Sequence, residues 1–200
     1  MSKNLLIIFT RNPELGKVKT RLAKTIGNEN ALSIYRTLLF QTERAVREIN
    51  CDKTVFYSEK ISDKDIWDNF IYQKRQQNGK NLGERMFNAF SEAFKNNYEK
   101  VIIIGSDLYD LLPNHINEAF QMLKNNDVVL GPADDGGYYL IGMNSLISQV
   151  FKNKIWGSST VLKETLNDLN DKSVYLLETL NDIDVYDDLK NIEAFNKFLL

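Results

Sequence analysis

Two residue types that support much of enzyme chemistry are scarce in this sequence. It has one cysteine, Cys51, and one histidine, His115, among 200 residues. The single cysteine excludes an internal disulfide and a cysteine-clustered metal site. We interpret Cys51 as an incidental core or helix-end residue, since a single histidine leaves a nucleophilic thiol little choice of base. His115 falls in the first turn of an expected helix, on its polar side, and we expect it to be solvated.

Long apolar runs and several familiar signatures are also missing. No apolar run is long enough for a membrane span, and the N-terminus lacks the pattern of a secretory signal, so we expect a cytoplasmic protein. The absence of G-x-x-x-x-G-K-[ST] excludes a P-loop NTPase, and the absence of G-x-G-x-x-G after the first apolar run disfavours a dinucleotide oxidoreductase. Neither G-x-S-x-G nor H-E-x-x-H occurs, which argues against the common serine hydrolases and zinc proteases.

What is present suits one soluble globular domain spanning residues 1–200. The chain is 43% apolar and 26% charged, and its length is ample for a sizeable core. Its net charge of −2 conceals an asymmetry, because the first 24 residues carry six Lys/Arg and one Glu, whereas residues 164–200 carry nine Asp/Glu and three Lys. This distribution argues against a nucleic-acid surface and fits a site that takes anionic phosphates together with a divalent cation.

The spacing of apolar residues predicts alternating strands and helices. We expect strands over residues 5–9, 53–58, 71–73, 101–104, 127–130, 138–142 and 174–177. We expect helices from near residue 17, over residues 29–49, 63–70, 82–94, 113–124, 145–151 and 160–169, and at the C-terminus, where Leu189, Ile192, Phe195 and Leu199 face the core. This order predicts a three-layer α/β/α domain with a mainly parallel sheet, in which the strand 138–142 is antiparallel because its connection is short.

The chain is organised around a basic loop at residues 10–22 (TRNPELGKVKTRL), directly after the first strand. A helix N-terminus together with Arg11, Lys17, Lys19 and Arg21 is typical of a phosphate site. A solvated basic turn would explain the charge alone. The position after a buried strand favours phosphate binding, because open α/β sheets bind ligands at the carboxyl ends of their strands.

Acidic residues provide a candidate metal site. Asp107 directly follows the strand 101–104, where a carboxylate can reach a metal held against a ligand's phosphates, and Mg²⁺ usually takes only one or two protein carboxylates. Asp182 and Asp184 alternate on an extended segment and are expected to point the same way as further metal ligands. The alternative for Asp184 is that it caps the last helix.

Two further turns are candidate binding segments. In residues 134–137, Asp134 and Asp135 suit a ribose or sugar hydroxyl, or a metal, while Gly136 and Gly137 would let the backbone approach a ligand. A tight turn explains the same residues. In residues 156–160 (WGSST), hydroxyl and N–H groups, including those of Ser158 and Ser159, suit an acceptor's anionic group, and ordinary helix capping is the alternative.

Taken together, these stretches resemble a known family over nearly the whole chain. The resemblance is carried by FTRNPELGKVKTRL (residues 9–22), LGERM (82–86), GSD (105–107), GPADDGGYYLIG (131–142), Trp156 with SSTV (158–161), and DID (182–184). They are similar to the DUF2064 family, whose members are described as glycosyltransferase-like, some of them associated with radical-SAM enzymes and with arsenosugar or selenium metabolism. That family is similar to the nucleotidyltransferases of molybdenum-cofactor and F420 biosynthesis.

The resemblance implies the nucleotide-diphospho-sugar transferase (GT-A) fold. It also implies phosphate binding by Lys17, Lys19 and Arg21, and metal binding by Asp107, Asp182 and Asp184. One departure concerns the residues after Gly-Ser-Asp, where Leu108-Tyr109 stand in place of the family's usual Cys-Pro or similar pair. The departure leaves Asp107 in place and puts the shape of the acceptor-side turn in question.

The leading functional hypothesis is a transferase that depends on Mg²⁺ (or Mn²⁺) and uses a nucleotide sugar as donor. Arg11, Lys17, Lys19 and Arg21 would neutralise its diphosphate, Asp107 would hold the metal, and Asp134 or Asp135 would act as base for a small-molecule acceptor. One alternative is nucleotidyl transfer from an NTP with release of pyrophosphate. Another is a non-catalytic nucleotide-binding module; neither a nucleic acid nor a membrane is expected as a partner.

Overall fold

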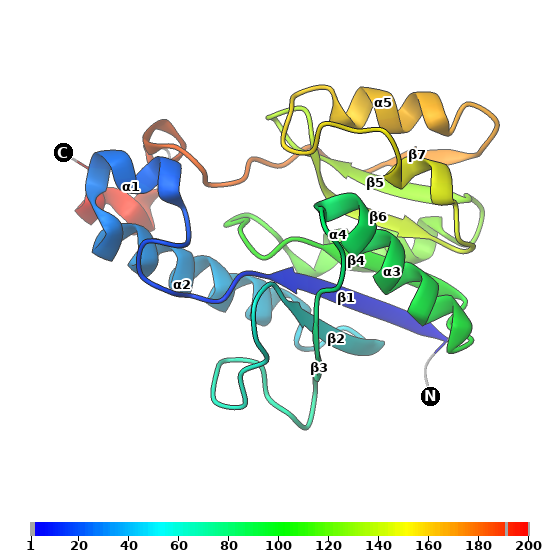
Figure 1. The fold of residues 1–200 in the computed structure, drawn as a ribbon, viewed down its shortest axis with the longest axis horizontal. Coiled ribbons are helices and arrows are strands. Elements are labelled where there is room, and N and C mark those ends of the chain that lie inside the picture. Colours follow the sequence, from blue (N-terminus) through cyan, green and yellow to red (C-terminus); the bar gives the residue numbers. More distant parts are fainter. Residues whose placement is uncertain (1–2, 191, 200) are drawn as a thin grey trace.

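The computed structural model describes residues 3–190 and 192–199, which build a seven-stranded sheet between layers of helices (Figure 1). The strand order is β3-β2-β1-β4-β6-β5-β7. The strands are β1 (Asn4–Thr10), β2 (Asp52–Tyr57), β3 (Gln73–Gln76), β4 (Lys100–Ile104), β5 (Val128–Pro132), β6 (Tyr138–Met143) and β7 (Val174–Leu176). All neighbouring pairs are parallel except those of β6, which is antiparallel to both β4 and β5. The predicted mainly parallel sheet with one antiparallel strand is confirmed.

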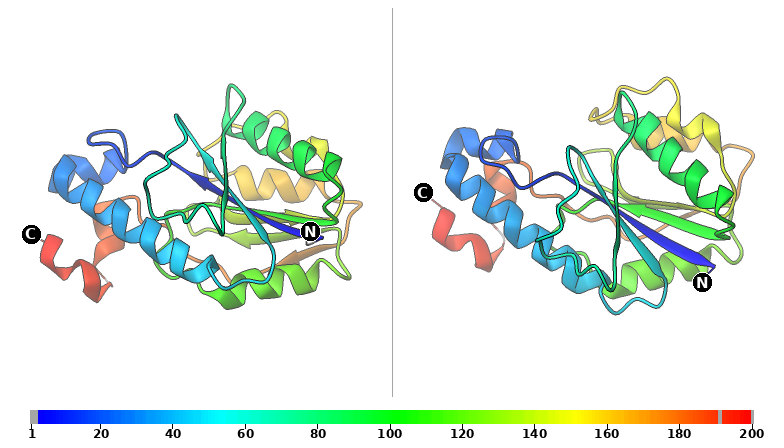
Figure 2. Two further views of the ribbon diagram at one scale, coloured as in Figure 1. Left: turned by 90° about the horizontal axis from the view of Figure 1, so that it is seen from below. Right: turned by 60° about the horizontal axis from the view of Figure 1, so that its bottom comes forward.

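Helices cover both faces of this sheet (Figure 2). They are α1 (Thr20–Ile26), α2 (Asn28–Val46), α3 (Leu82–Lys95), α4 (Pro113–Met122) and α5 (Val161–Asp168), with the 3₁₀ helices η1 (Ser148–Phe151), η2 (Tyr186–Leu189) and η3 (Glu193–Phe198). Helices α2 and α4 lie on one face, and α3, α5 and η1 lie on the other. The expected three-layer α/β/α arrangement is therefore present.

The two main cores follow from the alternation of side chains along the central strands. Leu6 and Ile8 of β1 pack with α2 and α4, whereas Leu5 and Ile7 pack with α3 and η1. Because successive side chains of a strand point to opposite faces, a strand covered on both sides must be apolar throughout. This explains why β1 and β4 read as continuous apolar runs.

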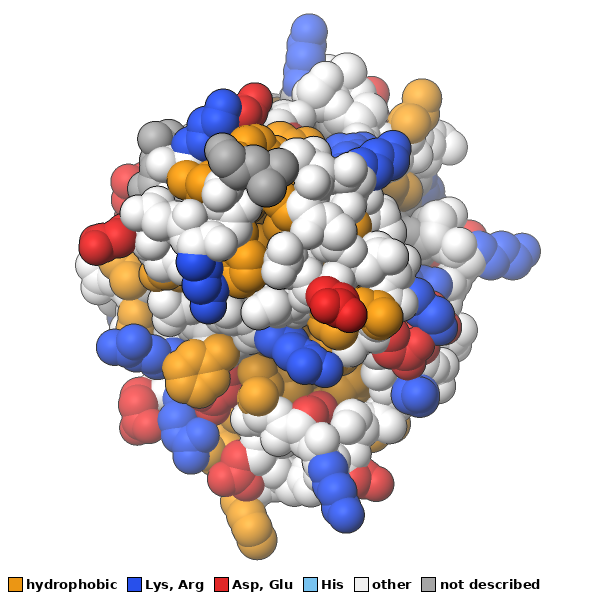
Figure 3. Space-filling model, turned by 90° about the vertical axis from the view of Figure 1, so that its left-hand side faces the viewer, with side chains coloured by type: hydrophobic (Ala, Val, Ile, Leu, Met, Phe, Trp, Pro, Cys, Tyr) orange, Lys and Arg blue, Asp and Glu red, His pale blue; other side chains and the backbone are white. Residues whose placement is uncertain are grey.

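A third, smaller core lies beyond the carboxyl end of β1, where α1 meets the C-terminal 3₁₀ helices. Leu22, Ile34, Leu189 and Phe195 are fully buried in it, and Ile192 and Leu199 pack against it. The four C-terminal apolar residues therefore face a core as predicted, although two short 3₁₀ helices replace the single helix. At this end of the molecule, basic and acidic side chains are interspersed (Figure 3).

The predicted helix over residues 63–70 is wrong, because this segment forms bends and turns. Asp65 Oδ1 accepts a hydrogen bond from the Trp67 N–H, and Asp68 Oδ1 accepts one from the Phe70 N–H. Aspartate side chains that bind the backbone two residues on stabilise turns in competition with helix. Buried Trp67 packs edge to face on Tyr72 and fixes the loop against the sheet.

The prediction for His115 is also wrong, because this side chain is buried. Its Nδ1 accepts a hydrogen bond from the Leu112 N–H at 3.1 Å. The residue before α4 is a leucine, which has no polar group to cap the helix, and the imidazole from the first turn bonds back to the free N–H instead. Its Nε2 lies 3.6 Å from a carboxylate oxygen of Glu178.

Smaller differences concern the ends of elements. The first helix begins at Thr20 rather than near Lys17, β3 lies at Gln73–Gln76 rather than 71–73, and the segment 145–151 contains only the short 3₁₀ helix η1. Cys51 is half-buried at the end of the α2–β2 connection, as expected for an incidental residue. Among the described residues, no helix is both long and apolar enough to cross a membrane.

Candidate active site

A cavity of about 780 Å³ lies at the carboxyl ends of β1 and β4. It is enclosed by the loop after β1, the turn after β4, the turn between β5 and β6, and the segment after β7. The structure brings most of the predicted site residues to its lining: Arg11, Lys17, Lys19, Arg21, Asp107, Asp135, Gly137, Ser158, Asp182 and Asp184. Residues separated by most of the chain therefore meet at one place, as expected for parallel strands.

Lys19 is the buried cation of this cavity. It directly precedes α1 with a left-handed backbone (φ 46°, ψ 45°), a conformation that costs a residue with a Cβ about 1–2 kcal/mol. Its side chain is only 5% exposed, and Nζ lies 2.9 Å from Oδ2 of Asp107. The strained backbone thus places an ammonium group beside the carboxylate that follows β4.

The turn after β4 and the segment after β7 bring two carboxylates to this position. Asp107 folds back over Gly105, where a Cβ would lie 3.0 Å from its Oδ1. Leu108 forms an antiparallel bridge with Asp182, and the Ile183 N–H donates to the Asp107 carbonyl at 3.4 Å. These backbone contacts hold Asp182 beside Asp107.

The carboxyl group of Asp182 titrates unusually. Its pKa is raised to about 6, first by burial and then by the negative charges of Asp107 and Asp135, while the positive charge of Lys19 acts in the opposite direction. Three carboxyl groups of the cavity lining therefore interact, and the ammonium group of Lys19 opposes their effect. A shift with a specific set of charged causes in a cleft is typical of functional sites.

The residues present fit a divalent cation such as Mg²⁺. Within residues 3–190 and 192–199, no three His, Cys, Asp or Glu side chains are grouped as a complete metal site. Mg²⁺ does not need such a group, because it commonly binds one or two carboxylates and takes its other oxygens from water and substrate phosphates. Asp107 and Asp182 supply two, and their mutual repulsion is the imbalance that a cation would relieve.

Two further cations of the loop, Lys17 and Arg21, form exposed ion pairs. Arg21 Nη1 lies 2.8 Å from Oδ2 of Asp184, and Lys17 Nζ lies 2.7 Å from Oε2 of Glu14. The bond with Glu14 raises the pKa of Lys17, and the bonds with Lys17 and Lys60 lower the pKa of Glu14. Exposed pairs of this kind are weak, so both cations can exchange their carboxylates for a phosphate.

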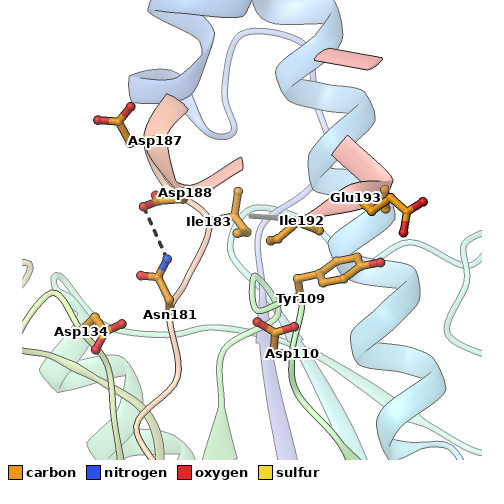
Figure 4. Close-up of a pocket in the computed structure, with 10 residues that line it drawn as sticks. Tyr109, Asp110, Asp134, Asn181, Ile183, Asp187, Asp188, Ile192 and Glu193 are labelled. Atoms are coloured by element: carbon orange, nitrogen blue, oxygen red, sulfur yellow. Dashed lines mark hydrogen bonds between the residues drawn. The ribbon is translucent and has the colours of Figure 1, made fainter. Parts of the chain in front are cut away.

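Asp134, predicted as substrate-binding, does not line this cavity. It lies on the wall of a second, acidic pocket of about 940 Å³ with Asp110, Asp187, Asp188 and Glu193 (Figure 4). In that view Asn181 Nδ2 donates to Asp188 Oδ1 at 3.5 Å. Asp135 alone of the two neighbouring aspartates reaches the main cavity, where its Oδ1 also accepts from the Gly137 N–H at 2.8 Å.

Gly136 and Ser159 pack against each other instead of lining the cavity. Gly136 has φ +86°, and a Cβ there would lie 2.2 Å from the Ser159 carbonyl oxygen. The glycine thus permits the β5–β6 turn to touch the segment before α5, a structural role that places Gly137 and Ser158 at the cavity. A similar close approach explains Gly83, where a Cβ would lie 2.6 Å from Cζ2 of Trp156.

Sequence reasoning missed the neutral amides that shape the cavity. Asn12 is buried, its Oδ1 accepts from the N–H groups of Glu59 and Lys60, and its Nδ2 donates to the Lys60 carbonyl. Gln77 Nε2 donates to the Phe56 and Thr10 carbonyls, and its Oε1 accepts from Arg85. The position of Asn12 inside the loop after β1 is the signal in the sequence that points to it.

Comparison with known proteins identifies the family. The model of a family described as "uncharacterized protein conserved in bacteria (DUF2064)" matches residues 41–158. The chain belongs to the DUF2064 family. The predicted family resemblance is thereby confirmed.

Solved structures support the fold of this DUF2064 protein. A candidate nucleotide-diphospho-sugar transferase from Desulfovibrio desulfuricans G20 superposes with a TM-score of 0.85 at 31% identity, covering 98% of this chain and 91% of that one. The inositol-1-phosphate CTP transferase from T. maritima superposes with a TM-score of 0.61 at 14% identity, covering 97% and 94%. The nucleotide-diphospho-sugar transferase fold is therefore shown, and the second likeness speaks for the fold alone.

One curated relative has a named activity. The chain is 27% identical over 145 residues to the 2-phospho-L-lactate guanylyltransferase of Methanocaldococcus vulcanius, an alignment that covers 70% of this chain. It spans 62% of the length of that enzyme. The relatives that carry a functional description are thus described as transferases, among them a guanylyltransferase and a candidate nucleotide-diphospho-sugar transferase.

Proposed function

We propose that this protein is a transferase that uses a nucleotide sugar as donor and moves the sugar to a hydroxyl of a small molecule. The observation that carries the proposal is the Lys19–Asp107 pair, a buried ammonium and a carboxylate 2.9 Å apart at the base of a cavity. This pairing suits a substrate whose phosphates lie between a fixed cation and a metal. A nucleoside diphosphate linked to a sugar has that character.

The basic loop would bind the diphosphate of the donor. Arg21 and Lys17 line the cavity on exposed side chains, and Lys19 supplies a buried charge. Arg11 also lines the cavity. Charge-assisted hydrogen bonds from such groups to phosphate oxygens are among the stronger ones in proteins.

Asp107 and Asp182 would hold Mg²⁺ (or Mn²⁺). When bound, this cation offsets the negative charge that develops on the departing nucleoside diphosphate, a contribution of several kcal/mol. Lys19 contributes to the same end from the protein side, because its ammonium is held in place before the reaction begins.

Asp135 would accept the proton of the acceptor. In the transfer, the acceptor oxygen forms a bond to the anomeric carbon, the bond from that carbon to the diphosphate oxygen breaks, and the nucleoside diphosphate leaves with the electron pair. The hydroxyl proton passes to the Asp135 carboxylate, which lines the cavity. Asp134 lies in the other pocket and is not part of this step.

The position of Asp135 favours a neutral acceptor. Its carboxylate would repel an acceptor phosphate placed beside it, whereas Asp182 would bind the metal and Asp184 pairs with Arg21. The Desulfovibrio protein, described as a candidate nucleotide-diphospho-sugar transferase, supports a nucleotide sugar as the donor.

Nucleotidyl transfer is the second candidate, and the guanylyltransferase relative favours it. In that reaction an acceptor phosphate oxygen attacks the α-phosphorus of an NTP, and pyrophosphate leaves with the electron pair of the broken bond. The same basic loop would then bind the triphosphate.

Product analysis with labelled donors tests the proposal. The protein is incubated with Mg²⁺ and a set of nucleotide sugars or NTPs, with the Asp107→Asn variant as control. We expect release of nucleoside diphosphate from a nucleotide sugar, lost in the control. Pyrophosphate release from an NTP without sugar transfer would establish the second candidate, and tight nucleotide binding without turnover would establish a binding module.

A further inference from the structure

The hydroxyl of Tyr35 lies between the two halves of the candidate site. Tyr35 projects from α2 and is 3% exposed, although the cavity reaches it. Its hydroxyl accepts a hydrogen bond from the Arg11 N–H at 2.9 Å and lies 3.2 Å from the Arg11 carbonyl. It therefore contacts both the N–H and the carbonyl of Arg11, the second residue of the basic loop.

The same hydroxyl reaches the turn that carries Asp107. It lies 3.3 Å from Thr10 Oγ1 and 3.4 Å from Ser106 Oγ, and Ser106 Oγ donates to Thr10 Oγ1 at 3.2 Å. Thr10 and Ser106 are each 3% exposed. Three buried hydroxyls thus connect the end of β1 to the residue before Asp107.

These hydroxyls lie beyond the point where backbone hydrogen bonds pair β1 with β4. The parallel pairing of β1 with β4 ends at Ile8 and Ile104, so Thr10 and Ser106 are beyond the last paired residues. The hydroxyl network replaces the missing ladder and fixes the spacing between the two loops.

We propose that Tyr35 is a positioning residue that couples the phosphate-binding loop to the metal-binding turn. The inference rests on the proposed function, because it assumes that the diphosphate bridges Arg11 and its neighbours to a cation on Asp107. Tyr35 touches neither ligand. It acts through the backbone of Arg11 and through Ser106.

A binding experiment on the intact protein separates coupling from stability. The dissociation constant of inorganic pyrophosphate is measured by calorimetry with and without saturating Mg²⁺, after allowance for the magnesium–pyrophosphate complex in solution. The constant without Mg²⁺ divided by the constant with Mg²⁺ gives a ratio that reports how strongly the metal and the phosphate reinforce each other. A merely structural tyrosine would lower stability without changing this ratio.

Tyr35→Phe is compared with Tyr72→Phe, which removes a hydroxyl from an equally buried tyrosine outside the cavity. The Tyr72 hydroxyl donates to Glu43 Oε1 at 3.3 Å, on the same helix that carries Tyr35. We expect Tyr35→Phe to lower the ratio about fivefold, the loss of a typical net hydrogen bond. Tyr72→Phe should leave the ratio at the wild-type value.

Ser106→Ala provides a second variant with the same expected direction, should Tyr35→Phe fold poorly. An unchanged ratio in both variants, or an equal fall in Tyr72→Phe, would overturn the inference and leave the proposed function standing. If the wild-type protein shows no strengthening of pyrophosphate binding by Mg²⁺, the proposed function fails, and the inference fails with it.

Discussion

The ammonium group of Lys19 lies 2.9 Å from a carboxylate oxygen of Asp107, from a backbone held in the left-handed region. The two residues come from the loop after β1 and the turn after β4, which are neighbouring parallel strands. The pair is largely withdrawn from water on the lysine side, where the exposed fraction is 5%. A buried charge of this kind is retained at some cost in stability, which favours a role in binding.

Replacing Lys19 with methionine should weaken pyrophosphate binding at least tenfold. The substitution keeps an unbranched side chain of similar length but removes a buried donor whose charged hydrogen bond contributes about 1.5–3 kcal/mol. Lys24→Met is the matched control, because Lys24 is an exposed cation of the same helix region and does not line the cavity. Calorimetry measures the dissociation constant of pyrophosphate for both variants. An equal loss of affinity in the two would show that only the net charge of the protein matters.

Asp182→Asn should raise the thermal stability of the ligand-free protein above pH 7. The pKa of Asp182 rises from 3.8 to about 6 on folding, so the folded state binds its proton more tightly than the unfolded state. Stability is therefore lost as pH rises from about 4 to about 6, and the full loss is present above that range. The asparagine variant avoids this loss, worth about 1 kcal/mol after allowance for solvent screening.

The measurement is the difference in unfolding free energy between variant and wild type as a function of pH. The difference should grow between pH 4 and pH 6 and then stay constant. Mg²⁺ should stabilise the wild type and not the variant, because a ligand of the folded state raises its stability. Asp187→Asn is the control, since this exposed carboxylate pairs with Lys190 outside the cavity. A flat pH difference for Asp182→Asn would contradict the assignment.

Cys51 should react slowly with iodoacetamide in the folded protein. The pKa of its thiol is raised to about 11, because the effect of burial exceeds the opposing effect of the nearby Lys53. Since the thiolate is the reactive form, only about one molecule in a thousand carries it at pH 8. Mass spectrometry of the time course should show labelling at least tenfold slower than in urea, and rising with pH up to 11. Equal labelling rates in the folded and the urea-unfolded protein would mean that the Cys51 thiol is exposed to solvent in the folded state.

The sequence predicted the fold well because the apolar patterns of the central elements are unambiguous. β1 and β4 are apolar throughout since both faces are covered, and α2 and α3 present one apolar stripe each. Prediction failed where side chains compete with the backbone for hydrogen bonds. Asp65 and Asp68 accept backbone hydrogen bonds that stabilise turns where a helix was expected. His115 accepts the hydrogen bond of the Leu112 N–H, because Leu112 has no polar side chain to cap α4.

The candidate site was predicted in outline for a similar reason. Loops after parallel strands meet at one edge of the sheet, so Lys19, Asp107 and Asp182 could be placed together from topology alone. The direction of a side chain within a turn could not be predicted in this way. Asp134 and Asp135 are neighbours, yet they line different pockets, and the turn that carries them includes Gly136 at φ +86°, packed against the Ser159 backbone.

A comparison of Gly136 with Gly157 allows the energetic importance of the contact between Gly136 and the Ser159 backbone to be measured. Their φ angles are nearly equal, +86° and +85°, so alanine at either position meets the same backbone strain of about 1–2 kcal/mol. At Gly157 an added Cβ has no neighbour within 4 Å, whereas at Gly136 it would lie 2.2 Å from the Ser159 carbonyl oxygen. Gly136→Ala must therefore displace the segment before α5 as well.

We expect Gly157→Ala to lower the unfolding free energy by about 1 kcal/mol and Gly136→Ala by about 3 kcal/mol or more, since the contact is with backbone that cannot rotate away. Urea unfolding of the two variants and the wild type measures the difference. Because Gly136 holds the β5–β6 turn that carries Asp135, its alanine variant should also lose transfer activity while still binding pyrophosphate at the basic loop. Equal destabilisation by the two alanines would mean that the turn moves away from Ser159 at little cost, and Asp135 would then not be held in place by this contact.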